Sequence, residues 1–165
     1  MGYDIERLSA CVPKITAWFR LNGRHFAWRD DPTPYHVWVS EIMLQQTRIE
    51  AVIDYYDRFI SVLPDIQSLS EVSDEVLMKL WQGLGYYSRA RNLKKAAGIV
   101  MREYNGQLPA SAQELQKLPG IGAYTAGAIA SIAMNRPEPA VDGNVLRVLM
   151  RVLGEYDYVM LDKTK

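Results

Sequence analysis

The amino-acid sequence predicts an all-α fold. Apolar residues recur every three or four positions along most of its 165 residues, which is the spacing of one helix face. Helix-capping residues precede several of these segments, and glycine or proline follows them. No strictly alternating stretch is longer than a few residues, so no β-strand is predicted.

The first long helix is predicted over residues 4–21. Pro13 falls inside this pattern, which predicts a break or two short helices. Gly23 follows its end, and residues 24–32 are expected to form a loop. Thr33 then has the character of an N-cap, ahead of a helix that we expect to run unbroken over residues 34–60.

Shorter helices follow along the rest of the chain. They are predicted over residues 66–69, 74–82, 86–104, 112–117, 123–134 and 145–153. Ser111 and Glu114 form the pattern of a capping box, and either Asp142 or Asn144 caps the last of these helices. Residues 162–165 look like the start of a further helix.

The composition predicts a globular protein of one domain, or one and a part. Hydrophobic residues make up 48% of the chain and charged residues 23%. No run approaches the roughly 20 apolar residues of a membrane span, and the N-terminus lacks the layout of a signal peptide. We therefore expect no membrane partner and a cytoplasmic location, on the nucleoid if the protein is bacterial.

Charge and cysteine content limit the partners and cofactors. The net charge is zero, which argues mildly against nucleic acid, because nucleic-acid-binding domains are usually basic. Such a partner would need local basic residues, backbone amides and helix N-termini. The single Cys11 excludes a multi-cysteine metal site within these residues. His25 and His36 lack a third ligand, so no metal site is predicted.

Glu41 is the first candidate for a catalytic residue. On a helix it shares a face with Val37, Trp38 and Leu44, and these apolar neighbours would partly desolvate its carboxylate. Desolvation raises the pKa of a carboxyl group, so that it can donate a proton near neutral pH. The alternative is a surface glutamate whose stem covers the core.

A glycine-containing turn over residues 118–122 is the second candidate feature. Gly120 and Gly122 permit a positive φ and expose the amides of the next helix N-terminus. Such amides bind phosphate and read no base sequence. The alternative is a tight turn between two helices.

Two further features fit the chemistry of a nucleic acid. Asp142 is either a helix N-cap or an ionised carboxylate that faces a developing positive charge. A protonated acid with an ionised partner is the arrangement that cleaves bonds at an anomeric carbon. Tyr86 follows a Gly-Leu-Gly turn, where it could enter a base stack while Arg89 and Arg91 approach phosphates.

Taken together, five segments resemble the MutY family of adenine DNA glycosylases, in the helix-hairpin-helix superfamily. They are residues 28–29, 40–47, 81–93, 118–129 and 141–148, in the order and spacing of that family. The resemblance implies a six-helix barrel domain over residues 28–140, with the helix-hairpin-helix at 112–134. Residues 1–27 and 141–165 would belong to a second, incomplete helical lobe.

The resemblance implies a monofunctional repair enzyme that hydrolyses the glycosidic bond of adenine opposite 8-oxoguanine or guanine. Its partner would be double-stranded DNA, bound by a monomer that flips the adenine into a pocket. The implied catalytic residues are Glu41 as general acid, Asp142 at the sugar cation, and Tyr124 and Asn144 in the same pocket. The remaining implied contacts are Trp28, Arg29 and Leu44 at adenine, Gln45, Gln46, Thr47, Leu84, Tyr86, Arg89 and Arg91 at DNA and the opposite base, and Gly120 and Gly122 at phosphate.

Other interpretations stay open beside this one. Endonuclease III-like relatives carry a Schiff-base lysine where this chain has Tyr124, and thymine-mismatch glycosylases carry tyrosine but lack the Gln45–Gln46 pair. A DNA-binding fragment without catalysis is a third, because the family's four-cysteine [4Fe-4S] segment is absent. This absence would also leave the apolar face of the first helix without its usual cover. The resemblance further implies a monovalent cation at the hairpin.

Overall fold

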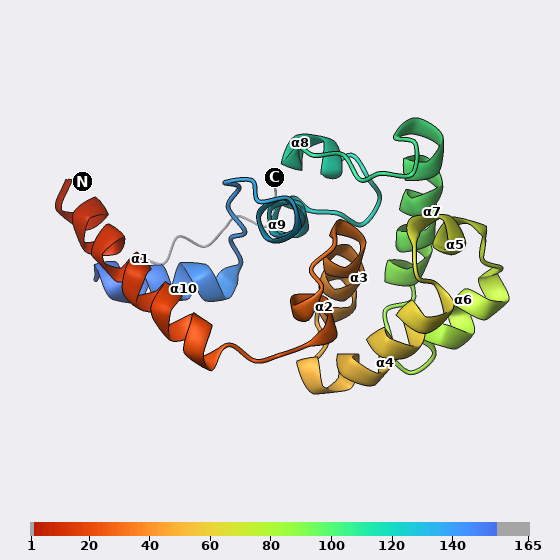
Figure 1. Cartoon of the computed structure of the whole chain (residues 1–165), viewed down its shortest axis with the longest axis horizontal. Helices are drawn as coiled ribbons and strands as arrows, with labels where there is room; N and C mark the ends of the chain where they lie inside the picture. The colour runs from red at the N-terminus through yellow and green to blue at the C-terminus, as the bar shows by residue number, and fades with distance from the viewer. Residues whose placement is uncertain (1, 155–165) are drawn as a thin grey trace. The chain divides into compact units, whose positions relative to one another are not determined.

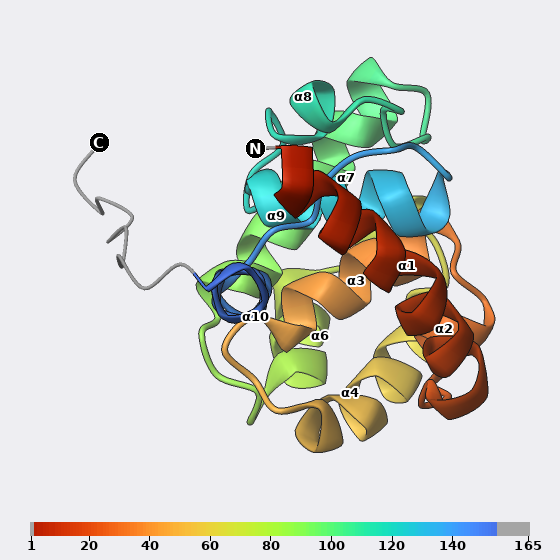
Figure 2. The same ribbon diagram turned by 90° about the vertical axis from the view of Figure 1, so that its left-hand side faces the viewer.

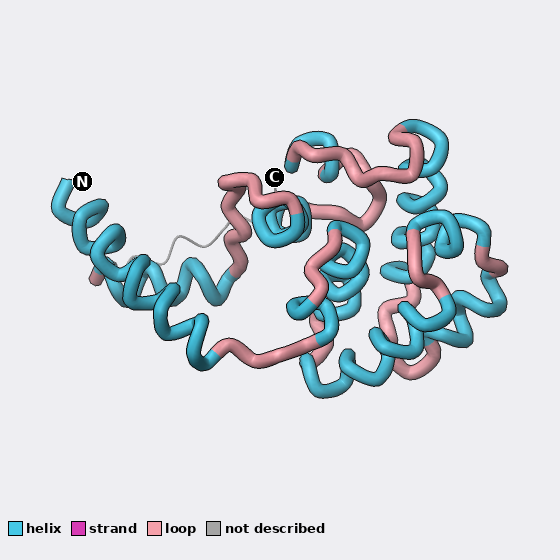
Figure 3. Tube along the Cα trace, in the orientation of Figure 1, coloured by secondary structure: helices cyan, strands magenta, loops and turns pink. Residues whose placement is uncertain are grey.

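The computed structural model describes residues 2–154, with side chains from residue 5, and every regular element in that range is helical (Figures 1 and 3). The elements are α1 (Gly2–Asn22), α2 (Ala27–Asp30), α3 (Pro34–Leu44), α4 (Ile49–Val62), α5 (Ile66–Glu71), α6 (Asp74–Trp81), α7 (Ser88–Glu103), α8 (Ala112–Leu115), α9 (Ala123–Ala128), the π-helical η1 (Ile129–Ala133) and α10 (Gly143–Leu153). The predicted all-α class is confirmed. The helix expected at residues 162–165 lies outside the described range.

The chain divides into two compact units. We call Met1–His25 with Val141–Lys165 the terminal unit, and Phe26–Ala140 the central unit. The central unit holds α2 to η1, whereas α1 and α10 belong to the terminal unit. Whether they correspond to a barrel and a second lobe stays a prediction.

Helix α3 lies in the middle of the central unit and packs against α4, α7, α9 and η1. Figure 2 shows α9 above α3 and α4 below it. Val37, Trp38, Val39, Ile42 and Met43 are at most 2% exposed, because this helix is apolar around most of its circumference. A helix buried in this way holds its few polar side chains in fixed positions.

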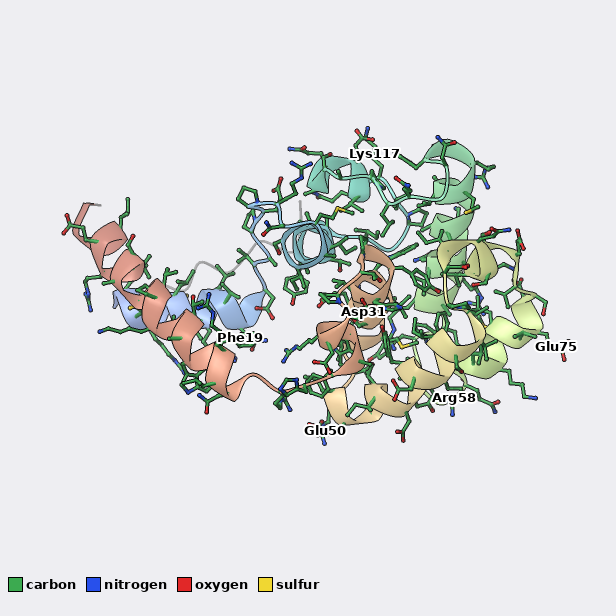
Figure 4. The ribbon with its side chains drawn as sticks, in the orientation of Figure 1. Phe19, Asp31, Glu50, Arg58, Glu75 and Lys117 are labelled. Carbon is green, nitrogen blue, oxygen red and sulfur yellow. The ribbon has the colours of Figure 1, made fainter. Side chains whose placement is uncertain are left out.

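The outer helices of the central unit are amphipathic. In α4, Val52 and Phe59 are fully buried, whereas Glu50 and Arg58 point outward (Figure 4). In α6, Leu77 is buried and Glu75 points outward in the same view. These helices therefore cover the core with one face each, as their apolar spacing predicts.

The predicted single helix over residues 34–60 is wrong, since α3 ends at Leu44 and α4 begins at Ile49. Gln46 between them has a φ of 57°, which no helix interior tolerates. The guanidinium of Arg89 binds the carbonyl oxygens at the end of α3 in place of the next helical turn. A side chain distant in sequence thus ends the helix, and the local apolar pattern contains no sign of it.

Other helices also differ from the sequence prediction. The expected loop over residues 24–32 contains the single turn α2, and Pro13 does not break α1, which loses one backbone hydrogen bond there and continues. The predicted α-helix over residues 123–134 becomes π-helical from Ile129. Apolar spacing alone does not separate these cases, because neighbouring packing decides them.

The predicted helix starts are confirmed where a capping side chain is present. Thr33 Oγ1 accepts a hydrogen bond from the His36 amide at 3.2 Å, and Ser111 Oγ accepts one from the Glu114 amide at 3.1 Å. Of the two alternatives for α10, Asp142 is the cap.

Helix α1 of the terminal unit carries exposed apolar side chains. Ile5, Ile15 and Trp18 are between 62% and 66% exposed. Across the described part of the chain, no helix is long and apolar enough to cross a membrane.

We expect Gly127→Ala to destabilise the central unit by about 3 kcal/mol, because a new Cβ would overlap the backbone carbonyl of Pro139, which cannot rotate away. Gly98→Ala is the matched control. Its Cβ would meet only the flexible end of Arg102, and a helix-interior Gly→Ala change stabilises by about 0.5–1 kcal/mol. Urea unfolding of both variants checks this prediction; equal stabilities would contradict the close backbone approach.

Candidate active site

Glu41 lies on α3, three residues before its end, and is partly buried. Its neighbours one turn back, Val37 and Trp38, are 2% and 0% exposed, and Leu44 is partly buried. The apolar flank that the sequence predicts is therefore present. The carboxyl group of Glu41 is therefore attached to a helix that packs against other helices of the core on several sides.

The end of α3 is tied directly to α9. Gln45 Nε2 donates a hydrogen bond to Thr125 Oγ1 at 3.4 Å, and Thr125 is 3% exposed. Tyr124, the preceding residue on α9, is 40% exposed. Packing of α3 against α9 thus brings the helix of Glu41 next to the helix of Tyr124, although 83 positions separate the two residues in sequence.

The turn between α8 and α9 has one glycine with a positive φ. Gly120 has a φ of 83°, and a Cβ there would lie 3.0 Å from Asn92 Cβ, so the prediction holds for this position. Gly122 is extended instead, with a φ of −88°, and serves as the N-cap of α9 without a capping side chain. No atom would lie within 4 Å of a Cβ at Gly122, so the backbone at the start of α9 is open to a close approach.

The turn before α7 projects an aromatic ring into solvent. Gly83, Gly85 and Tyr86 have φ values of 98°, 75° and 49°, and Tyr86 is 61% exposed. Leu84 points the other way and is 7% exposed. The ring of Tyr86 is thus exposed to solvent, whereas Leu84 anchors the turn in the core.

Arg89 is buried, although the sequence predicts that it contacts phosphate. Its side chain is 8% exposed, and both terminal nitrogens donate to oxygen atoms of the chain itself. Burial lowers the pKa of its guanidinium. This role was not predictable from the sequence, because a basic residue in the first turn of a basic helix gives no sign of it. Arg91, by contrast, is exposed.

Trp28 and Arg29 lie on α2, at the edge of the core. Trp28 is 6% exposed, stacks on Phe26 with ring centroids 4.9 Å apart, and meets Tyr56 edge-on at 5.0 Å. The guanidinium carbon of exposed Arg29 lies 5.2 Å from the centre of the Phe26 ring. The aromatic stack fixes α2 against α4, so Trp28 is a packing residue in this structure.

Asp142 caps α10 with its carboxylate. Oδ1 accepts from the amides of Val145 at 2.8 Å and Asn144 at 3.0 Å, and Oδ2 accepts from Asn144 Nδ2 at 2.8 Å. These hydrogen bonds, that from Val145 first, hold the pKa of Asp142 below its ordinary value. Asn144 Oδ1 in turn accepts from Arg147 at 2.6 Å. Asp142 is therefore ionised at neutral pH; it belongs to the terminal unit, and Glu41 to the central one.

The residues present do not fit an iron–sulfur cluster. Such a cluster needs four thiolate ligands, and Cys11 is the only cysteine of the sequence. Within the described range, no group of three histidine, cysteine or acidic residues could hold a metal ion.

The central unit thus combines a glycine turn between α8 and α9 with a carboxyl group on its central helix, α3. Residues 39–157 match the HhH-GPD superfamily of base excision DNA repair proteins, and the chain belongs to this superfamily. Among curated proteins it is similar to the adenine DNA glycosylase of Mus musculus, with 46% identity over 158 residues. That match covers 90% of this chain and 31% of the mouse protein, so the chain spans about a third of that relative's length.

Solved structures give the same class. A thermostable thymine-DNA glycosylase superposes with a TM-score of 0.81 at 28% identity, covering 87% of this chain and 67% of that one. An Endonuclease III–DNA complex superposes with a TM-score of 0.74 at 26% identity, covering 87% of this chain and 66% of that one.

Proposed function

We propose that this chain is the catalytic core of a DNA glycosylase that removes adenine opposite 8-oxoguanine or guanine in double-stranded DNA. The observation that carries the proposal is the position of Glu41, on a helix buried in the core and one turn before Gln45. The identity to an adenine DNA glycosylase supports the choice of base. The partly buried setting of Glu41 suits a proton donor.

The reaction begins with a flipped adenine, because the glycosidic bond is out of reach inside a duplex. Glu41 protonates N7 of adenine, so that the base leaves neutral. The ionised carboxylate of Asp142 stabilises the positive charge that develops on the sugar, and water then completes the hydrolysis. Tyr124 and Asn144 are the two further catalytic residues of this proposal. Arg29 and Leu44 contact the adenine, with Trp28 supporting them from the core.

Because the chain has no net positive charge, the DNA phosphates are held in this proposal by backbone amides of the protein and by local basic residues. The amides at Gly120 and Gly122 bind a phosphate, and Arg91 adds a charge. The exposed ring of Tyr86 enters the base stack, with Leu84 beneath it. Gln45, Gln46 and Thr47 face the opposite strand. Endonuclease III, whose solved DNA complex superposes on this chain, binds DNA with a similar fold.

The same proposal extends to the accessory groups. A monovalent cation would be bound by backbone carbonyls of the 118–122 turn. The [4Fe-4S] cluster of the family would need cysteines that residues 1–165 do not contain. The protein acts as a monomer in the cytoplasm.

An excision assay tests the proposed function. With the full-length protein in excess over a duplex with adenine opposite 8-oxoguanine, we expect alkali-labile breaks at the adenine and free adenine as the product. Without alkali the strand stays intact, and borohydride traps little covalent complex, because Tyr124 offers no amine. Binding without released adenine would favour a DNA-binding module, release of thymine from a mismatch would favour a thymine glycosylase, and efficient borohydride trapping would favour a lyase.

A further inference from the structure

The buried guanidinium of Arg89 joins two turns that are far apart in sequence. Nη1 donates to the carbonyl oxygens of Ile42 at 2.9 Å, Met43 at 2.8 Å and Gln45 at 2.6 Å. Nη2 donates to Thr47 Oγ1, and to the carbonyl oxygens of Leu84 and Gly85, each at 3.2 Å. We call residues 45–48 the glutamine turn and residues 82–87 the wedge turn.

Each turn contains a non-glycine residue with a left-handed backbone. Gln46 has a φ of 57° and Tyr86 a φ of 49°. Such conformations persist only where the surrounding structure enforces them. Arg89 binds a residue directly before each of them, Gln45 in one turn and Gly85 in the other, and its guanidinium carbon lies 5.4 Å from the centre of the Tyr86 ring. One side chain therefore restrains both.

The chemistry of these acceptors explains the choice of arginine. The carbonyl groups at the end of α3 lack helical partners and carry the negative end of the helix dipole. The guanidinium group is planar and has two terminal nitrogens, so it can bind these carbonyls on one side and the wedge turn on the other. Lysine keeps the charge but has a single nitrogen, so it cannot reproduce both sides.

We infer that Arg89 is a positioning residue that couples the glutamine turn to the wedge turn. This inference rests on the proposed function, in which Gln46 and Thr47 face the opposite strand and Tyr86 enters the base stack. Coupled in this way, the two turns present one rigid surface to the duplex. Arg89 itself touches no substrate.

Hydrogen exchange without DNA tests the coupling by itself. The Thr47 amide donates to the Leu44 carbonyl and the Leu84 amide to the Trp81 carbonyl, so these two amides report on the glutamine turn and the wedge turn. In Arg89→Lys we expect both amides to exchange at least about tenfold faster, and together. Leu93→Ala, which opens a cavity one helical turn further along α7, is the control. Loosening of only one turn, or equal exchange in both variants, would overturn the coupling.

Single-turnover excision then tests the positioning role. At a temperature where both variants are folded, Arg89→Lys should excise adenine opposite 8-oxoguanine roughly 100-fold more slowly than the wild type, because a misplaced reacting group loses about that factor. Leu93→Ala should excise adenine at a rate within about threefold of the wild-type rate. A wild-type rate in Arg89→Lys would refute the positioning role. Should the wild-type protein excise no adenine, the proposed function fails, while the exchange experiment still decides the coupling.

Discussion

Glu41→Gln is expected to abolish adenine excision while the protein stays folded. General acid catalysis contributes typically 10²- to 10⁴-fold, so the single-turnover rate should fall by about that factor. The amide has the shape of the carboxyl group but cannot donate its proton to N7. The other residues of α3, and not Glu41, form the core. The free energy of unfolding should therefore change by no more than about 1 kcal/mol.

Glu75→Gln is the matched control for this change. Glu75 is an exposed glutamate of the same unit that points outward from α6 (Figure 4). Quench-flow measurement of adenine release, with circular dichroism as the check on folding, separates the two variants. An unchanged rate in Glu41→Gln would remove Glu41 from the mechanism and return it to the role of a residue that covers the core.

Asp142→Asn should have the second-largest effect. Asparagine is as good an N-cap as aspartate, so α10 keeps its first-turn hydrogen bonds. The negative charge that would stabilise the sugar cation is lost, and electrostatic groups of this kind contribute about 10²- to 10³-fold. We therefore expect a rate loss of that size with an unchanged helical circular dichroism signal.

Asp142→Ala provides the complementary variant. It removes the charge and also the hydrogen bonds to the Asn144 and Val145 amides, so it should additionally destabilise α10 by about 1 kcal/mol. Equal excision by Asp142→Asn and the wild type, combined with weaker folding of Asp142→Ala, would mean that Asp142 is a helix cap and nothing more.

Much of the fold follows from local sequence. The caps at Thr33, Ser111 and Asp142 mark helix starts, because a side-chain oxygen satisfies amides only a few residues away. Apolar spacing predicts the amphipathic α4 and α6 for a similarly local reason. The glycine with a positive φ at position 120 was also predictable, since few other residues adopt that backbone.

The candidate site was predictable as a set of residue types and not as an arrangement. The sequence by itself determined the all-α class, the helix starts and the carboxyl group on an apolar flank, all of which depend on neighbours within one or two turns. Only the tertiary structure decided where α3 ends, because Arg89, more than 40 positions away, binds its last carbonyls. It also made Trp28 a packing residue, and set Gln45 against Thr125. Such contacts depend on which helices pack together, and a local periodicity carries no information about that.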